Sequence, residues 1–328
     1  MANLSTVYMG MKLKSPFIVG SCSLTSDMDS LRKAETAGAG AVVIKSLFEE
    51  QLQAEAVRLE NALSAYENMI AEALSFHPAY AHAGPSEHLH WIEKARKELS
   101  IPIIASLNAV SPGRWTDYAT QLVDAGADAL ELNFFGIITD PQVSGQDALR
   151  AMIATAREIK TKVTVPVAVK LTPFILSPGY VVAGLDATGV DGLVLFNRFA
   201  RFDIDIATES VRYQMALTSS RDMEHSLRWV SLLHDRTQAD ICGSSGIHTL
   251  DDVIKMILAG AGSVQLVSAL YQHGMNYLSD LHTGLDEWMN RKGYDSIQDF
   301  QGRVSRSRSG QPFVFERHQY IKALLGIQ

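Results

Sequence analysis

Eight short apolar runs, rich in valine, isoleucine and leucine, recur along this chain and limit the folds that it can adopt. Each run is continuous rather than alternating with polar residues, which is the pattern of a strand buried on both faces of a parallel sheet. The runs cover residues 16–21, 39–46, 101–108, 127–134, 165–172, 190–197, 239–246 and 262–269. The pattern therefore predicts eight parallel strands.

Helical segments separate most of these runs. We expect helices over 27–37, 115–125, 145–161, 178–188, 222–235 and 249–259, several of them opening with a capping residue such as Asp27 or Thr249. Glycines such as Gly38, Gly126 and Gly260 stand between a helix and the next run, where a left-handed residue commonly ends a helix.

Eight strands that alternate with helices predict an α/β fold, the closed (β/α)8 TIM barrel, as one domain over residues 1–328. A doubly wound open sheet is the competing fold. It usually has fewer strands, and its glycine-rich fingerprint after the first strand is missing from Gly20-Ser21-Cys22-Ser23.

Two connections are too long for plain loops. They cover 47–100 and 198–221, after the second and sixth strands, and both leave the strand ends where barrels place their active sites. We expect them to form long insertions that act as lids or substrate walls. The tail from about 276 to 328 is predicted to be helical at first and to pack on the barrel or against a second subunit.

Composition excludes several classes of protein. A net charge of −7 and a pI near 5.8 argue against a nucleic-acid binder that neutralises phosphates. The two cysteines, Cys22 and Cys242, cannot build a zinc cluster, and we expect no metal site. The first residues do not read as a secretory signal, and no apolar stretch of about 18 residues is present. These features favour a cytoplasmic enzyme that acts on a small molecule and binds neither membrane nor nucleic acid.

Polar side chains stand near the ends of four of the buried runs. Lys45 and Lys170 belong to the second and fifth runs, and Asn133 and Asn197 to the fourth and sixth. Burying such groups is costly, so they need a reason. One reading is structural: each lysine pairs with a neighbouring carboxylate such as Glu131. We favour the functional reading, because active sites of barrels lie at the C-terminal ends of the strands.

Small residues follow the last two strands. Gly243, Ser244, Ser245 and Gly246 end the seventh run, and Val267-Ser268 lies in the eighth. Loops after these two strands often bind phosphate through backbone N–H groups. A phosphate at one side and lysines at the other suit flavin mononucleotide (FMN), because a lysine beside N1 stabilises the charge on the reduced ring. Asparagines can bind the amide edge of that ring.

The chain also resembles a known family, the dihydroorotate dehydrogenases, flavin enzymes of pyrimidine synthesis built as (β/α)8 barrels. The resemblance covers nearly the whole chain, and its soluble branch is the nearer match. The matching segments are SPFIVGS, AGAVVIKS, LELNF, VAVKLTP, LFN, GSSGIHTLDDVIKMILAGAGSVQLVSAL and WMNRKGYDSIQDFQGRV.

The resemblance implies a role for each matching residue. Lys45 would lie between flavin and substrate with Ser46 beside it, and Lys170 would lie at the N1 edge of the flavin. Asn133 would contact flavin or substrate, and Asn197 would bind substrate. Flavin contacts are implied for Gly20 and Ser21, phosphate contacts for Gly243, Ser244, Ser245, Gly246, Val267 and Ser268, and Asn108 is a further candidate for the same cavity. A homodimer is implied by the resemblance alone.

The chain departs from the family where the catalytic base is usually found. The cysteine or serine of the loop after the fourth strand is replaced by Gly136, which cannot accept a proton, and a nearby asparagine is replaced by Ile138. Thr139, Ser144 and His77 are substitute candidates, although Thr139 and Ser144 also read as ordinary loop residues. The resemblance implies dihydroorotate or a related cyclic amide as the substrate, Gly136 counts against dihydroorotate with the usual base, and the electron acceptor is left open.

Two other functions stay open at this point. A lyase or aldolase barrel would use Lys170 or Lys45 as a Schiff-base amine, with the last two loops holding a substrate phosphate. A flavin-binding homologue without turnover would account for the missing base. The absorbance of the purified protein distinguishes the lyase or aldolase from a flavoprotein, since a flavoprotein is yellow and a Schiff-base enzyme is colourless.

Overall fold

The computed structural model describes residues 2–48, 85–108, 115–136, 138–198, 201–214, 216–310, 312–315 and 318–326. Eight parallel strands close into a barrel in the hydrogen-bonded order β11-β12-β3-β4-β5-β6-β7-β8. The strands are β3 (Phe17–Val19), β4 (Ala41–Phe48), β5 (Ile103–Asn108), β6 (Ala129–Asn133), β7 (Val167–Leu171), β8 (Gly192–Leu195), β11 (Asp240–Gly243) and β12 (Ser263–Leu266). Each overlaps one apolar run, so the predicted (β/α)8 fold is confirmed.

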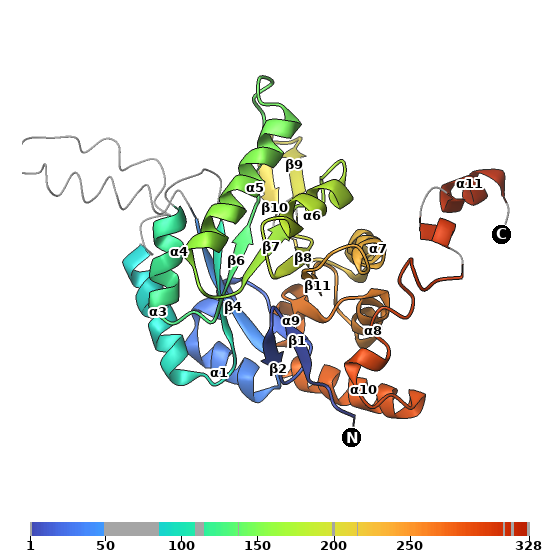
Figure 1. Ribbon diagram of the computed structural model, residues 1–328, viewed down its shortest axis with the longest axis horizontal. Helices are drawn as coiled ribbons and strands as arrows, with labels where there is room; N and C mark the ends of the chain where they lie inside the picture. Colours follow the sequence, from blue (N-terminus) through green and yellow to red (C-terminus); the bar gives the residue numbers. More distant parts are fainter. Residues whose placement is uncertain are drawn as a thin grey trace, which may run out of the picture.

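Helices surround the barrel on its outside (Figure 1). Those between strands are α1 (Met28–Thr36), α3 (Pro85–Glu98), α4 (Trp115–Asp124), α5 (Gly145–Lys162), α6 (Pro178–Asp186), α7 (Met223–Leu233) and α8 (Leu250–Ala259). The predicted caps are present: Asp27 accepts from the N–H of Ser30, and Thr249 from that of Asp252. Every predicted helix is found within a few residues, but α3 was not predicted.

The interior of the barrel has an apolar lower layer and a polar upper layer. The lower layer contains Ile18, Ala41, Val43, Ile104, Ala129, Ala168, Val194 and Cys242, all buried in one cluster. Two residues further along β5, β6 and β7 stand Ser106, Glu131 and Lys170, which point the same way because side chains alternate along a strand. The upper layer lies at the C-terminal ends of the strands and forms the floor of the candidate site.

A short hairpin closes the lower end of the barrel. It consists of β1 (Thr6–Tyr8) and β2 (Met11–Leu13), and it packs Tyr8, Met9 and Leu13 against the lower layer. Burial raises the pKa of the Tyr8 hydroxyl well above its ordinary value. The sequence did not predict this hairpin, because strands of three residues carry too little pattern.

The two predicted insertions differ in what they contain. After β8 the chain forms an antiparallel hairpin, β9 (Arg201–Asp205) and β10 (Ser210–Gln214), followed by the short 3-10 helix η4 (Ser220–Asp222). After β4, residues 49–84 lie outside the described part, and the connection then ends in α3. A further 3-10 helix, η1 (Ser23–Ser26), follows β3.

The C-terminal tail begins with helices that complete the barrel. α9 (Ser268–His273) follows β12, and α10 (Tyr277–Lys292) buries Leu278, Leu281, Leu285 and Met289. The 3-10 helices η5 (Ile297–Asp299) and η6 (Pro312–Phe315) follow, and α11 (His318–Leu325) lies apart from the barrel in Figure 1. None of the helices in the described ranges is both long and apolar enough to cross a membrane.

Candidate functional site

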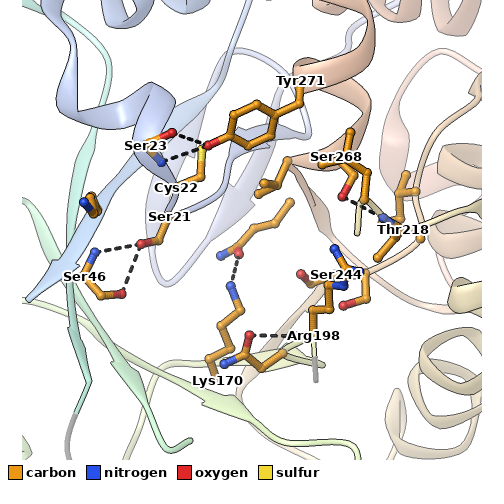
Figure 2. Close-up of a pocket in the computed structure, with 18 of the residues that line it drawn as sticks. Ser21, Cys22, Ser23, Ser46, Lys170, Arg198, Thr218, Ser244, Ser268 and Tyr271 are labelled. Carbon is orange, nitrogen blue, oxygen red and sulfur yellow. Dashed lines mark hydrogen bonds between the residues drawn. The ribbon is translucent and has the colours of Figure 1, made fainter. Parts of the chain in front are cut away.

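A cavity of about 510 Å³ opens at the C-terminal mouth of the barrel, where most of the predicted site residues converge. It lies within the size range of small-molecule and cofactor pockets. Figure 2 shows Ser21 and Ser46 on one side of Lys170, with Ser244 and Ser268 on the other. The described lining residues are Ser21, Cys22, Ser23, Lys45, Ser46, Phe48, Lys170, Asn197, Arg198, Leu217, Thr218, Ser244, Ser245, Gly246, Ile247, Gln265, Val267, Ser268 and Tyr271.

Lys170 forms the floor of the cavity. It is 7% exposed, and its Nζ donates to Oε1 of Gln265 at 2.8 Å. Glu131, 1% exposed, lies 3.5 Å from the same Nζ through Oε1. Lys170 thus pairs with Glu131, as the structural reading expected, and it also lines the cavity, while its functional role stays a prediction.

Lys45 lies at a β-bulge in β4. The pairing of β4 with β5 shifts by one residue between Ile44 and Leu47, so the strand continues to Phe48 instead of ending near Lys45 as the sequence suggested. The Lys45 side chain is exposed, whereas the next residue, Ser46, is buried. Nε2 of His88 lies 2.9 Å from the carbonyl oxygen of Lys45, so α3 helps to hold the bulge.

Three serines form a chain of hydroxyl groups beside the floor. The Ser46 hydroxyl lies 3.1 Å from that of Ser21 and 2.7 Å from that of Ser106. The Ser46 N–H also donates to the Ser21 hydroxyl at 2.8 Å. Since a hydroxyl both donates and accepts, the chain can orient toward either a donor or an acceptor in the cavity.

The loops after β11 and β12 form the other side of the cavity. Ser245 and Gly246 have φ angles of 70° and 72°, a left-handed turn that Gly246 adopts without strain. The Ser245 hydroxyl donates to the Phe196 carbonyl at 3.0 Å. The Thr218 N–H donates to the Ser268 hydroxyl at 3.1 Å, which ties the segment before α7 to the start of α9. Small side chains and backbone groups therefore surround this part of the cavity.

Two asparagines are joined beside the cavity. Nδ2 of Asn197, which lines the cavity, donates to Oδ1 of Asn133 at 2.6 Å. Asn133 pairs in register with Asn108 and Lys170 on the neighbouring strands. Neither Asn133 nor Asn108 is among the described residues that line the cavity, so Asn133 is connected to it through Asn197.

Other predicted residues lie around the cavity or away from it. A Cβ on Gly20 would lie 2.7 Å from Cγ2 of Val267, so Gly20 packs just below the lining, whereas Gly243 faces Met256 of α8. Among the substitute bases, Thr139 is exposed, and Ser144 caps α5 by accepting from the N–H of Asp147. His77 lies outside the described residues.

Gly136, at the position of the missing base, is exposed on the loop after β6. A Cβ built on it would meet no atom within 4 Å. The described part of this loop thus offers space for a larger side chain at position 136 but no proton acceptor there.

The sequence reasoning missed part of the lining. Gln265 lies inside the apolar run VQL, the same signal that identified Lys170, and could have been found. Ser23 and Tyr271, whose hydroxyls are hydrogen-bonded, carried no such signal because they lie outside the runs. Cys22 lies beside them, and burial raises the pKa of its thiol, which disfavours the reactive thiolate.

The charges that line the cavity are all positive among the described residues. Lys45, Lys170 and Arg198 are cations, and no described lining residue is an aspartate or glutamate. Together with the turn at Ser245 and Gly246, this arrangement suits an anionic ligand.

Comparison with known proteins agrees with this geometry. The family model for dihydroorotate dehydrogenase matches residues 3–289. The catalytic subunit of dihydroorotate dehydrogenase B (NAD(+)) from Methanosarcina acetivorans is 28% identical over 304 residues, covering 89% of this chain and 93% of that protein. The NAD-dependent dihydropyrimidine dehydrogenase subunit PreA from Escherichia coli is 23% identical over 327 residues, covering 93% of this chain and 77% of that protein.

Proposed function

Because the chain belongs to the dihydroorotate dehydrogenase family, we propose that it is an FMN-dependent oxidoreductase that oxidises a CH–CH bond of dihydroorotate or a related cyclic amide. The observation that carries the proposal is the Lys170 ammonium on the floor of the cavity at the barrel mouth. Although Lys170 is held by Gln265 and Glu131, its ammonium also lines the cavity, where it can attract an electron-rich ligand.

The residues present fit FMN. When bound, FMN would supply a ring that accepts two electrons and a hydrogen from the substrate. Lys170 would stabilise negative charge at the N1 edge of that ring, and the hydroxyls of Ser21 and Ser46 would bind along its polar edge. The hydrogen bond from Lys170 to Gln265 would hold the ammonium in its orientation toward the ring.

The phosphate of FMN would lie against the loops after β11 and β12. The left-handed turn at Ser245 and Gly246 leaves the backbone close to the cavity, and Ser244 and Ser268 offer hydroxyl groups. Only small residues allow a backbone to approach an anion in this way. Val267 also lines the cavity beside these residues.

The substrate would lie between the ring and the mouth. Lys45 is exposed there, and the amide of Asn197 can donate and accept hydrogen bonds toward a cyclic amide. The described residues place no proton acceptor at position 136, so we propose that the base comes from another residue or that the substrate needs none at that place. For this reason the proposal includes dihydropyrimidines other than dihydroorotate.

The decisive experiment uses the purified protein under anaerobic conditions. A yellow protein whose flavin absorbance bleaches with dihydroorotate or dihydrouracil supports the proposal, and the substrate that bleaches it faster identifies the class. A colourless protein that gains no flavin absorbance when incubated with FMN refutes it. The Schiff-base alternative predicts trapping by borohydride at Lys170 or Lys45 in the presence of substrate. For Lys170 it is disfavoured because Glu131 and Gln265 favour the charged ammonium, which has no lone pair.

A second candidate function follows from Gly136. A bound flavin that no cyclic amide reduces would favour a flavin-binding homologue without turnover. We also propose, from the family resemblance alone, that the chain forms a homodimer. A mass from light scattering that corresponds to one chain would contradict the dimer without affecting the proposed reaction.

A further inference from the structure

We propose that Glu131, acting together with Gln265, sets how strongly Lys170 attracts electrons into the flavin, and is therefore a positioning residue for the reaction. The inference rests on the proposed function, because it needs FMN in the cavity. Glu131 itself does not line the cavity among the described residues, so it would act through the ammonium above it.

The three side chains form a closed ring of polar contacts. Lys170 donates to Oε1 of Gln265 at 2.8 Å and lies 3.5 Å from Oε1 of Glu131, and the amide nitrogen of Gln265 donates to Oε2 of Glu131. All three are nearly inaccessible, with Gln265 2% exposed. Because both oxygens of Glu131 face donors, the ring stabilises the carboxylate, which only accepts hydrogen bonds.

Gln265 sets the balance between the two charges. It stands on β12, across the barrel from β6 and β7, and contacts both partners at once. The ammonium lies nearer to the amide oxygen of Gln265 than to the carboxylate, at 2.8 Å against 3.5 Å. Gln265 thus holds Lys170 at the cavity floor and keeps it from closing fully onto Glu131. Glu131 therefore compensates the positive charge of Lys170 only in part, and the remainder acts on a ligand in the cavity.

Two substitutions in this ring should act in opposite directions. Glu131→Gln keeps the shape but removes the negative charge, so the ammonium attracts electrons more strongly and the bound flavin becomes easier to reduce. Gln265→Met removes the amide, so Lys170 closes onto Glu131 and the flavin becomes harder to reduce. A purely structural role would weaken flavin binding or stability in both variants without this opposite pair of shifts.

The test is the equilibrium between bound FMN and a reference redox dye during slow anaerobic reduction, read from the two absorbance bands. We expect Glu131→Gln to raise the equilibrium constant for flavin reduction by about tenfold, since two charges roughly 10 Å apart in a protein interact at about that level. Gln265→Met should lower it by about threefold or more on the same grounds. Asp240→Asn is the matched control, because Asp240 is a partly buried carboxylate at the opposite end of the barrel, where it accepts from the Met9 N–H.

The outcomes separate this inference from the proposed function. If wild-type protein binds no FMN, both are overturned. If wild-type protein binds FMN, shifts of opposite sign, with Asp240→Asn within about twofold of wild type, support the inference. Shifts of the same sign, or no shift in either variant, overturn it and leave the proposed function standing. If Glu131→Gln does not fold, a lowered constant in Gln265→Met supports the inference, and an unchanged or raised one overturns it.

Discussion

The turn at Gly246 offers a sharp test of how the site is built. This glycine has a φ of 72°, and a Cβ built on it would overlap the Met223 nitrogen and lie 2.9 Å from the Ser219 carbonyl oxygen. Both atoms belong to backbone, so they cannot move aside as the end of a flexible side chain would. Gly246→Ala should therefore displace the segment that includes Thr218 and η4, which forms one wall of the cavity.

The expected loss in the free energy of unfolding has a conformational part and a steric part, and substitutions at other glycines can separate the two. The left-handed conformation costs a residue with a Cβ about 1–2 kcal/mol, and forcing extra volume into a packed site costs about 1–3 kcal/mol. Gly246→Ala should thus lower the free energy of unfolding by about 2–5 kcal/mol, less about 0.4–1 kcal/mol for the stiffer unfolded chain. Gly293, at the end of α10, has a φ of 73° and a ψ of 32° with no atom within 4 Å of its Cβ, so Gly293→Ala isolates the conformational part.

The assay is urea unfolding of these two variants and of Gly136→Ala, which has neither strain nor contact and should stay within about 0.5 kcal/mol of wild type. FMN titration of the folded proteins follows in parallel, and Gly246→Ala should bind FMN most weakly. If Gly246→Ala loses no more stability than Gly293→Ala, the close approach of backbone at this turn does not constrain the site, and the reasoning fails.

Three more predictions concern the rest of the site. Lys45→Ala should slow anaerobic flavin reduction by roughly 10²-fold while the free energy of unfolding changes little, because the side chain is exposed; equal reduction rates would remove Lys45 from the reaction. Gly136→Ser should speed reduction by dihydroorotate by about 10²-fold if position 136 is the place of the base, and stopped-flow traces identical to wild type would show that it is not. Burial lowers the pKa of His88, so the unfolded chain takes up a proton first and stability falls as the pH drops below about 6.5. His88→Gln should make this loss between pH 7 and 5 smaller in urea unfolding, and an unchanged loss would contradict the assignment.

The fold could be predicted well from the sequence because each element of the barrel has a recognisable local sequence pattern. Each buried strand is a continuous apolar run, and glycines such as Gly38 and Gly260, with φ angles of 98° and 135°, separate helices from the following strands. The family resemblance stated from the motifs is confirmed by the family model. The hairpin β1–β2 and helix α3 were missed, because three-residue strands and a helix next to a histidine-rich stretch carry little periodicity.

The site was predictable only where a polar residue interrupted an apolar run. Lys170 was found by that signal, and its pairing with Glu131 was correctly considered as an alternative. The hydroxyl chain of Ser21, Ser46 and Ser106 was not foreseen, because serines are common and only the close packing of β3, β4 and β5 brings these three together. Which residues face the cavity depends on the bulge in β4 and on side-chain directions, and neither can be read from spacing alone.

The two layers inside the barrel have different roles: the lower layer contributes to stability, and the upper layer forms the floor of the candidate site. The hydrophobic core formed by the strands and the helices, to which the apolar lower layer and the hairpin beneath it add, buries most of the apolar side chains of the described residues, and the charges of the upper layer are not part of it. The upper layer is therefore free to change during evolution, as long as its charges remain compensated as those of Lys170 and Glu131 are. Substitutions near the site can therefore change the substrate, or remove a reactive group such as the one replaced by Gly136, without changes in the hydrophobic core.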